Sequence, residues 1–580
     1  MTQPEIAAAD LAIASPPAWR AVAGRSLVPA IASLGLVMIV SLLASVLLRS
    51  FGSLESATGR AAIIALFSDA EYYRTLLDTF YFALLTTVVA MLFGVPIAWF
   101  VERTDLPGRE AIRVMMGAGI LIPGFFTAMG WVYLAHPRIG MLNIWLKDAG
   151  IVINIQTLTG MGFVQGLALA ALAFVVAAPS LSAIDSTLEE SAEIHGLSLV
   201  NRFRYVTLPL VTPALMASAL VTFMVALAVF DIPAVLGLSA KILLYSTYVY
   251  NLVNPASAEP LYEIAAASSA PMLLLAVGLS VLYYRIIRQS SRYQVVSGKG
   301  YRSKLTPLGA RGRVGGLTFV GLYLFLVLLL PLLLVAWGSF LPFFRPISVD
   351  ALRFLSFNNY VGVLTPSLWT AVGHTLIFSV VAPTFTTIIS VALSWVILRQ
   401  SRAISRAVEL IAFLPLSIPS VIFGVGAITI ALAIGSFVPI YGSLALIILV
   451  EIVVRTSVAT RITGSAMVQI HRELDEAGAV FGLSTGVRFT RILLPLLGPA
   501  LAYCWLFLAV LAFRELTVPA LLVSRDNLTV SVYTWGLLSL GSLGRASAVT
   551  ILVLLSVALL GAATLVVGRL AVRVRAEGRS

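Results

Sequence analysis

Two stretches of the sequence, GLSLVNRFRYVTLP at residues 196–209 and GLSTGVRFTRILLP at residues 482–495, share Gly-Leu-Ser, Arg-Phe and Leu-Pro at identical spacing. The stretches are 286 residues apart. The same offset aligns three further pairs: Glu190 with Glu476, Pro213 with Pro499, and Pro233 with Pro519. Such regular matches indicate an internal duplication, which has to be recognised before any other pattern is interpreted.

Toward the N-terminus the duplication continues at an offset of 296 residues. This offset gives four pairs: Trp99 with Trp395, Arg103 with Arg399, Pro123 with Pro419, and Gly130 with Gly426. A longer loop around residues 136–160 than around residues 435–440 accounts for the ten-residue difference, because insertions into surface loops cost little.

The composition is that of a protein dissolved in lipid. Of 580 residues, 59% are hydrophobic and 11% are charged, whereas soluble proteins carry about 25% charged residues. A membrane-spanning helix needs roughly 20 apolar residues. Twelve such stretches are predicted, near residues 28–48, 79–101, 113–135, 161–183, 212–236, 264–284, 316–340, 373–397, 408–434, 441–463, 497–522 and 547–568. Runs such as residues 322–334 lack the alternation of an outer-membrane β-barrel.

The spans and the duplication together predict an all-α polytopic membrane protein, with twelve transmembrane helices in two tandem homologous six-helix halves. An even number of spans per repeat makes the halves parallel in topology, so they can pack about a pseudo-two-fold axis along the membrane normal. We expect an N-terminal tail (residues 1–27), a first permease half (28–284), a basic linker (285–315), a second permease half (316–568) and a C-terminal tail (569–580).

The positive charge of the chain, +12 overall, is concentrated where helices leave the membrane. The 285–315 linker has no acidic residue and eight basic ones: Arg285, Arg288, Arg292, Lys299, Arg302, Lys304, Arg311 and Arg313. Basic residues also precede the first span and follow the last. The positive-inside rule places the linker and both termini in the cytoplasm. The charge therefore indicates membrane topology rather than nucleic-acid binding.

Each duplicated stretch falls in the cytoplasmic loop between the fourth and fifth spans of its half. In the first copy, Ser186 and Thr187 followed by Glu189 and Glu190 are capping-box signals for a short helix. Gly196 and Gly482 suit a helix C-cap with positive φ. Ser198 and Ser484 are expected to cap the next helix, and Leu-Pro is expected to end it. The pattern predicts a rigid helix–turn–helix elbow in each half.

The elbows resemble the EAA motif of bacterial ABC importer permeases, which is Glu-Ala-Ala, three residues, Gly, nine residues, Ile, one residue, Leu-Pro. The second copy keeps Glu476, Ala477, Gly482, Ile492, Leu494 and Pro495, with Gly478 for the second Ala. The first copy keeps Glu190, Ala192, Gly196, Leu208 and Pro209, with Ser191 for the first Ala and Val206 for Ile. The resemblance implies a type I importer permease fold in the bacterial inner membrane. It also implies two copies of an ATP-binding cassette subunit docked on the elbows, and a periplasmic substrate-binding protein.

Other transport and catalytic classes lack their usual motifs here. Gly298-Lys299-Gly300 is not a phosphate-binding loop, because Tyr293 replaces the earlier Gly and no Ser or Thr follows the Lys. We therefore expect no ATPase site and no enzymatic activity in this chain. A secondary transporter of the major facilitator type is an alternative, but residues 103–109 lack its Gly-x-x-x-Asp-Arg-x-Gly-Arg pattern. The single cysteine, Cys504, excludes an intrachain disulfide, and the spacings predict no metal site or cofactor.

Charged residues within spans usually face a cavity or a partner. Asp231 precedes Pro233 in the fifth span, and Arg514 and Glu515 precede the equivalent Pro519 in the eleventh. These residues either line the translocation route or its gate, where helix breaks free backbone carbonyls, or Arg514 and Glu515 merely satisfy each other or a neighbouring helix. Four other residues receive no pathway or catalytic role: Glu451 and Arg455, expected to be interfacial near the cytoplasmic end of the tenth span, and His195 and His374.

Fused permeases with Arg-Thr-Asp-Leu-Pro-Gly-Arg after the second helix and Gly-Lys-Gly-Tyr-Arg in the linker resemble the ferric-iron importer group. Those sequences are residues 103–109 and 298–302 here. The resemblance implies ferric iron as cargo. Similar permeases carry 2-aminoethylphosphonate, thiamine or polyamines, and in such systems the binding protein supplies most of the specificity.

Overall fold

The computed structural model describes all residues except 1–17, 53–54, 185, 257, 291–304 and 578–580. Most of the predicted N-terminal tail and the centre of the predicted basic linker therefore lie outside the described residues. In the part that is described, the chain is built from helices, and the only β-type pairing is an isolated bridge between Thr104 and Thr306.

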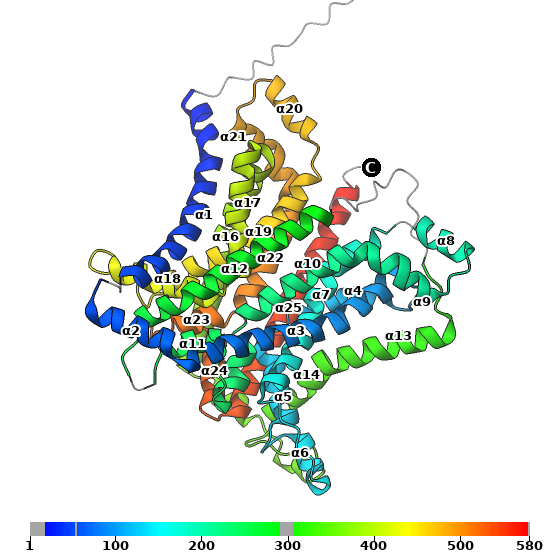
Figure 1. Ribbon diagram of the computed structural model, residues 1–580, viewed down its shortest axis with the longest axis vertical. Helices are drawn as coiled ribbons and strands as arrows, with labels where there is room; N and C mark the ends of the chain where they lie inside the picture. The colour runs from blue at the N-terminus through cyan, green and yellow to red at the C-terminus, as the bar shows by residue number, and fades with distance from the viewer. Residues whose placement is uncertain (1–17, 53–54, 185, 257, 291–304, 578–580) are drawn as a thin grey trace, which may run out of the picture.

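The first repeat contains six long helical segments, one of them bent (Figure 1). The segments are α1 (Ala18–Gly52), α3 (Ala70–Arg103), the pair α4 (Arg109–Gly119) and α5 (Gly124–Ala135), α7 (Leu158–Ser182), α10 (Leu208–Ala228) and α12 (Tyr262–Ser290). Short helices connect them: α2 (Ala57–Ser68), α6 (Met141–Trp145), α8 (Ser186–Ile194), α9 (Leu199–Arg202) and α11 (Tyr245–Val253).

The long segments of the second repeat follow the same order. Its long segments are α13 (Gly309–Leu324) with α14 (Leu330–Ser339), α16 (Pro366–Arg399), α17 (Arg402–Ser417) with α18 (Ser420–Ala433), α19 (Leu444–Val468), α22 (Leu494–Phe513) and α25 (Leu543–Glu577). Its short helices are α15 (Asn358–Val363), α20 (Arg472–Val480), α21 (Thr485–Arg488), α23 (Thr517–Leu521) and α24 (Val530–Ser539).

Helix boundaries reproduce both offsets found in the sequence. The long helices α3 and α16 start and end 296 residues apart, and α7 and α19 do so 286 residues apart. The predicted duplication is confirmed at this level. The ten-residue difference falls between them, where the first repeat adds α6 before α7.

The number of spans is only partly confirmed. Among the described residues, eight helices are long and apolar enough to cross a membrane, or ten if each bent pair counts as one span. Of the other two predicted spans, α19 carries three charges, Glu451, Arg455 and Arg461, and α25 has a described apolar stretch of only Leu543–Leu559.

Two predicted spans are sharply bent rather than straight. The angle between α4 and α5 is 98°, and that between α17 and α18 is 104°. Pro123 and Pro419 stand at the N-caps of α5 and α18. Proline lacks a backbone donor and disfavours a helical residue before it, so a helix ends at this point in both repeats.

The first span of each repeat packs into the other repeat. Ile39, Leu42 and Val46 of α1 belong to a hydrophobic core formed mainly by the second repeat, together with α11 and α12 of the first. Val320 and Tyr323 of α13 belong to a core formed mainly by the first repeat. The two halves are therefore tied together by exchange of their first helices, and neither repeat forms its core alone.

Equivalent glycines receive the exchanged helices. A Cβ added to Gly130 in α5 would lie 2.4 Å from the Cβ of Pro331 in α14. A Cβ added to Gly426 in α18 would lie 2.3 Å from the carbonyl oxygen of Leu42 in α1, and Ser45 donates a hydrogen bond to the Gly426 carbonyl at 3.0 Å. Both positions require close approach of two backbones.

We expect Gly130→Ala and Gly426→Ala each to lower the free energy of unfolding by about 1–3 kcal/mol, the usual cost of overpacking a close contact. Thermal unfolding of the purified protein in detergent measures the effect. Gly498→Ala in α22 is the matched control, because a Cβ there has no atom within 4 Å and alanine favours the helix. Equal stability of all three variants would contradict the proposed role of the two glycines.

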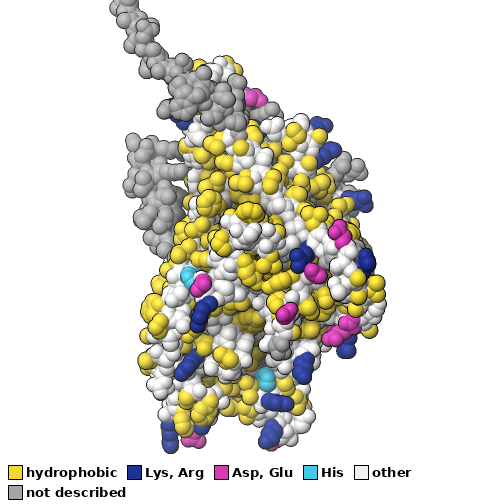
Figure 2. All heavy atoms as spheres, turned by 90° about the vertical axis from the view of Figure 1, so that its left-hand side faces the viewer, with side chains coloured by type: hydrophobic (Ala, Val, Ile, Leu, Met, Phe, Trp, Pro, Cys, Tyr) yellow, Lys and Arg dark blue, Asp and Glu magenta, His cyan; other side chains and the backbone are white. Residues whose placement is uncertain are grey.

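The outer surface suits contact with lipid. Figure 2 shows hydrophobic side chains spread over one face, with the charged groups mostly in its lower half and along its right-hand side. Many large apolar side chains are exposed, for example Leu77, Leu92 and Leu274 on α3 and α12. A water-facing surface would not carry so large an apolar area.

Candidate functional site

The first elbow consists of α8, a turn and α9, and the second consists of α20, a turn and α21. Gly196 and Gly482 have φ values of 81° and 73°, so the predicted positive-φ C-caps are confirmed. In the first turn Leu197 donates to the Ala192 carbonyl at 3.1 Å and Gly196 to that of Glu193 at 2.9 Å. The second turn has the same two bonds, Leu483 to Gly478 and Gly482 to Ala479, both at 3.0 Å. Each elbow thus ends its first helix in a Schellman motif.

The structure of the second elbow explains why Gly478 stands in place of the second Ala of the motif. A Cβ at Gly478 would lie 3.0 Å from Cδ of Arg488 and 3.1 Å from Cδ1 of Ile492. Glycine lets the two helices of this elbow approach closely. In the first elbow, an ion pair between Arg202 and Glu193 at 2.7 Å holds the helices together.

Two local predictions for the elbows are wrong. Among the described residues the hydroxyl of Ser484 has no hydrogen-bond partner and so does not cap α21, whereas the Ser198 hydroxyl accepts a long capping bond of 3.5 Å from the Asn201 amide. The Leu-Pro pairs at 208–209 and 494–495 do not end a helix. Each follows a five-residue π-helical turn, Phe203–Thr207 or Phe489–Leu493, and begins α10 or α22. The wider turn accommodates proline without breaking the helix. The side chains of Ser186, Thr187 and Glu189 lie outside the described residues.

The tips of both elbows expose large apolar side chains. Ile194 is 84% exposed, and the equivalent Val480 is 85% exposed. Phe481, next to Val480, is 84% exposed. The elbows themselves lie at two separate ends of the molecule, α20 at the top and α8 at the right of Figure 1. Exposed apolar groups on a rigid turn are typical of a surface that binds another protein.

A second group of candidate functional residues, all of them charged, lies near the C-terminal ends of α10 and α22. Here α10 ends at Ala228 and α22 ends at Phe513, and Asp231, Arg514 and Glu515 follow these ends. Pro233 and Pro519 are buried in the short turns beyond, so helix breaks occur beside both prolines. We call Asp231, Glu451, Arg455, Arg514 and Glu515 the charge cluster.

Arg455 is the centre of the charge cluster. Its Nε donates to Oε1 of Glu451 at 2.6 Å, and its Nη2 donates to Oε2 of Glu515. The other carboxylate oxygen of Glu515 accepts from the Thr517 amide at 3.0 Å. The side chains of Glu451, Glu515 and Arg455 are 1%, 12% and 19% exposed, so the ion pairs are largely withdrawn from solvent.

Arg514 connects the two repeats. Its Nη1 donates to the carbonyl oxygen of Ile122, at the bend between α4 and α5, at 2.8 Å. Asp231 lies beside the same bend, because a Cβ added to Gly124 would be 2.9 Å from its Oδ2. Asp231 and Arg514 also interact electrostatically. The cluster therefore spans the interface between the halves.

The prediction that Glu451 and Arg455 are interfacial is wrong. They are the eighth and twelfth of the 25 residues of α19, away from its cytoplasmic end, and they pair inside the protein. Arg514 and Glu515 pair with neighbouring segments rather than with each other, as the second alternative allowed: Glu515 with Arg455 of α19, and Arg514 with the Ile122 carbonyl. Glu451 and Arg455 have the i,i+4 spacing of a helical ion pair, and that spacing is the signal in the sequence that could have identified the cluster.

The segment after α3 fastens the start of the second repeat. The buried guanidinium of Arg103 donates to the Ile184 carbonyl, just before α8, at 3.0 Å. Asp105 accepts from the Leu308 amide at 3.0 Å and from Arg313 at 2.5 Å. These bonds from Arg313 and Leu308 lower the pKa of the Asp105 carboxyl. Residues 103–105 thus contact both the elbow end of α7 and the chain entering α13.

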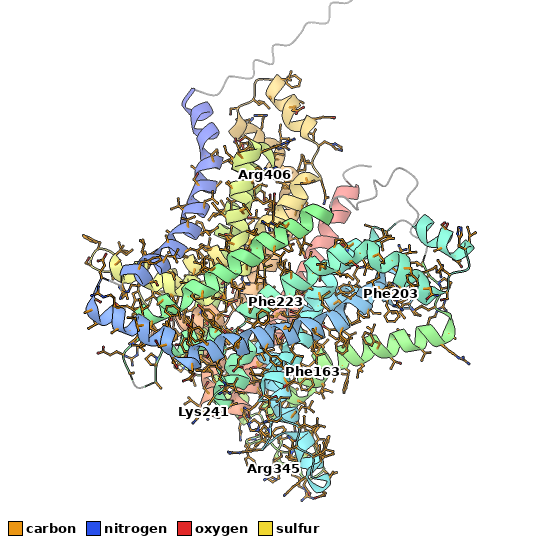
Figure 3. The ribbon with its side chains drawn as sticks, in the orientation of Figure 1. Phe163, Phe203, Phe223, Lys241, Arg345 and Arg406 are labelled. Atoms are coloured by element: carbon orange, nitrogen blue, oxygen red, sulfur yellow. The ribbon has the colours of Figure 1, made fainter. Side chains whose placement is uncertain are left out.

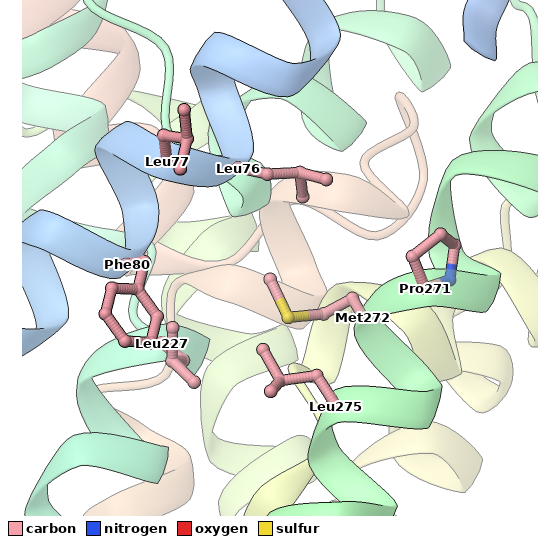
Figure 4. A pocket seen from close by; sticks show the side chains of 7 residues that line it. All are labelled: Leu76, Leu77, Phe80, Leu227, Pro271, Met272 and Leu275. Atoms are coloured by element: carbon pink, nitrogen blue, oxygen red, sulfur yellow. The ribbon is translucent and has the colours of Figure 1, made fainter.

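Other features offer less to a charged substrate. A cavity of about 220 Å³ between α3, α10 and α12 has only apolar lining residues: Leu76, Leu77, Phe80, Leu227, Pro271, Met272 and Leu275 (Figure 4). In the described part of the chain, no group of three or more His, Cys, Asp or Glu side chains is arranged to hold a metal ion. Cys504 is buried.

The fold and the paired elbows define a membrane-spanning transport subunit, and comparison with known proteins gives its class. Residues 94–292 match the family described as the inner membrane component of binding-protein-dependent transport systems. The chain is a permease of this ABC importer type, and the major facilitator alternative is not supported.

Relatives match along both repeats. A putative ferric transport system permease protein, FbpB 1, of Haemophilus influenzae is 24% identical over 81% of this chain and 73% of its own length. The ferric transport system permease protein FbpB of Actinobacillus pleuropneumoniae is 24% identical over 84% of this chain and 70% of its own. The sn-glycerol-3-phosphate transport system permease protein UgpA of Yersinia enterocolitica is 26% identical, with 43% of this chain matching 86% of its length. A single-repeat permease thus corresponds to about half of this chain.

Proposed function

We propose that this permease forms the translocation pathway for ferric iron in an importer driven by separate ATPase subunits. The observation that carries the proposal is the pair of equivalent elbows with exposed apolar tips, Ile194 on one and Val480 with Phe481 on the other. Two elbows on one chain match two copies of an ATP-binding cassette subunit. The residues proposed to form these docking sites are Glu190, Ala192, Gly196, Leu208 and Pro209, and Glu476, Ala477, Gly482, Leu494 and Pro495.

The proposed topology puts both elbows, both termini and the 285–315 linker in the cytoplasm, with permease halves at residues 28–284 and 316–568. The basic residues of the linker support this orientation through the positive-inside rule. ATP hydrolysis belongs to the partner subunits and not to this chain. ATP binding draws the two ATPase subunits together, the elbows follow, and the helices attached to them reorient the pathway.

The charge cluster is proposed to close the pathway in the conformation described above. Arg514 of the second repeat holds the Ile122 carbonyl of the first, so the halves cannot separate there without breaking this contact. With Asp231, Glu451 and Glu515 against Arg455 and Arg514, the cluster carries one more negative than positive charge. A cationic cargo is favoured over an anionic one at such a site.

Ferric iron is favoured over 2-aminoethylphosphonate, thiamine and polyamines because two relatives that match both repeats are named as ferric transport permeases. The test is reconstitution of the permease with its ATPase subunits and binding protein in liposomes. We expect ATP-dependent uptake of radiolabelled ferric iron. Uptake of a phosphonate instead of iron would contradict the proposed cargo but not the assignment as an ABC importer permease. If no ATPase subunit binds, the proposal that separate ATPase subunits drive transport would be wrong.

Asp231→Asn is expected to reduce the initial rate of uptake by about tenfold, because the partly buried Arg514 loses the carboxylate that interacts with it most strongly while the side-chain shape is kept. Initial uptake rates at equal amounts of assembled transporter measure it. Asp526→Asn, at an exposed position outside the cluster, is the control and should leave the rate unchanged. Normal uptake by a normally assembled Asp231→Asn transporter would remove Asp231 from the pathway.

A further inference from the structure

Two lobes project from the face opposite the elbows. Lobe A consists of residues 136–157 and 340–365, and lobe B consists of residues 55–69 and 434–443. In each lobe, one segment follows the first span of a repeat and the other precedes the fourth span of the opposite repeat. Since α7 and α19 lead to the elbows at their C-terminal ends, segments before their N-terminal ends lie on the other side of the membrane. The exchange of first helices thus makes the lobes equivalent by pseudo-symmetry.

Contacts within lobe A hold its surface in a fixed conformation. Tyr133 at its base stacks on Phe344, with ring centroids 4.5 Å apart. Asn143 donates to the carbonyls of His136 and Ile153 at 2.9 and 2.7 Å and accepts from the Ile153 amide at 2.7 Å.

The second segment of lobe A is fixed in a similar way. Asn359 donates to the carbonyls of Ser339 and Leu341 at 3.0 and 2.7 Å. The guanidinium of Arg345 lies 4.0 Å above the ring of Phe354. Arg345 is at the lower tip of the molecule in Figure 3.

The two lobes differ in size and in charge. Lobe A contains the helix α6, for which lobe B has no counterpart. Four basic and two acidic residues give lobe A a net charge of +2: Arg138, Lys147, Arg345 and Arg353 against Asp148 and Asp350. Glu55 and Asp69 against Arg60 give lobe B a net charge of −1.

The charges of lobe A are available to a partner. Arg138, Lys147 and Arg353 are exposed, and none of the ion pairs within the described residues involves them. Burial and the neighbouring Arg138 lower the pKa of His136, so this residue adds no positive charge at neutral pH. The outer face therefore has a net positive charge on lobe A and a net negative charge on lobe B, although the two lobes are related by pseudo-symmetry.

We propose that lobe A binds an acidic surface on one lobe of the substrate-binding protein, so that this protein docks in a single orientation with its other lobe on lobe B. This proposal rests on the proposed function, because it takes the partner from it. Binding proteins of this kind consist of two domains that close around the ligand. A permease with two equal lobes would accept both orientations, whereas unlike charges on the two lobes favour one and disfavour the other.

The first test is the triple variant Arg138→Glu, Lys147→Glu, Arg353→Glu in the complete transporter. We expect the concentration of binding protein that half-maximally stimulates ATP hydrolysis to rise about tenfold at low salt, with a smaller difference at high salt because charges at a rim are screened. Hydrolysis without binding protein should be unchanged. The control Arg138→Lys, Lys147→Arg, Arg353→Lys keeps the charge and should behave as wild type.

A half-maximal concentration within twofold of wild type for the charge-reversed variant would overturn the proposal, as would an equal loss in the charge-keeping control. Failure of the proposed function is distinguishable, because the unaltered transporter would then show no stimulation by any binding protein.

Orientation is tested separately by cross-linking. Cys504 is buried and is the single cysteine of the chain, so Ala149→Cys in lobe A and Ser436→Cys in lobe B each introduce one exposed thiol. A photoactivatable reagent on each thiol should capture peptides from different domains of the binding protein. Capture of both domains from both positions would overturn a single orientation.

Discussion

Arg455→Ala is expected to lower the free energy of unfolding by about 3–5 kcal/mol, the usual effect of removing one partner from a buried ion pair. Arg455 holds two carboxylates, Glu451 and Glu515, and both are largely withdrawn from solvent. Without the guanidinium, two negative charges remain buried in the same place, and they repel each other. Thermal unfolding in detergent and the yield of folded protein in membranes measure the loss.

Further substitutions among Glu451, Arg455 and Glu515 test whether the loss of stability is caused by the unpaired charges. Adding Glu451→Gln and Glu515→Gln to Arg455→Ala removes the stranded charges and should recover a large part of the stability. Arg461→Ala, on the same helix, is the matched control: Arg461 donates to the Tyr283 hydroxyl at 3.1 Å and lies over the ring of Phe413. Its loss should cost about 1 kcal/mol, as for a partly exposed cation–π contact. An Arg455→Ala protein as stable as Arg461→Ala would contradict the network.

The elbows and the duplication were predictable from the sequence because local signals determine them. A glycine at the end of a short helix needs only its neighbours to adopt a positive φ, and Gly196 and Gly482 do so as expected. Spacing is likewise preserved along the chain, so the 286- and 296-residue offsets appear unchanged in helix boundaries.

Features that depend on packing between distant segments were not predictable. The exchange of first helices brings Leu42 to Gly426 and Pro331 to Gly130, and no periodicity in a single sequence identifies such partners. Glu451 and Arg455 were placed at an interface because charge in a span is costly. Glu515, which pairs with Arg455, lies 60 residues further along the chain. The Leu-Pro pairs were expected to end helices, but the π-helical turns before them accommodate the proline, which lacks a backbone N–H donor.

The charge cluster and the elbows belong to the same moving parts. From Arg202 the first elbow runs without a break through the π-helical turn into α10, and α10 leads to Asp231. The second elbow runs in the same way from Arg488 into α22 and to Arg514 and Glu515. A displacement of either elbow is therefore carried along one helix to the cluster. Under the proposed function, this continuity is the mechanical link between ATP binding and opening of the contact between Arg514 and the Ile122 carbonyl.

The double variant Ile194→Asp, Phe481→Asp is expected to abolish coupling while leaving the permease folded. Both side chains are 84% exposed, so their replacement costs little within this chain. At a protein interface, burial of a charge in place of a large apolar side chain costs at least about 2 kcal/mol at each elbow. Affinity for each ATPase subunit should then fall by about 30-fold, and ATP-dependent uptake should be lost. Co-purification of the ATPase subunits and their binding affinity in detergent measure the effect.

Leu540→Asp is the matched control, because Leu540 is 83% exposed and follows α24 on the face opposite the elbows. Its ATPase subunits should remain bound with unchanged affinity. The duplication also predicts the behaviour of the two single variants. Ile194→Asp and Phe481→Asp alone should each release one ATPase subunit more readily than the other, since each alters a single elbow. Full ATPase binding by the double variant would show that the exposed tips are not the docking surface, whatever the elbows do otherwise.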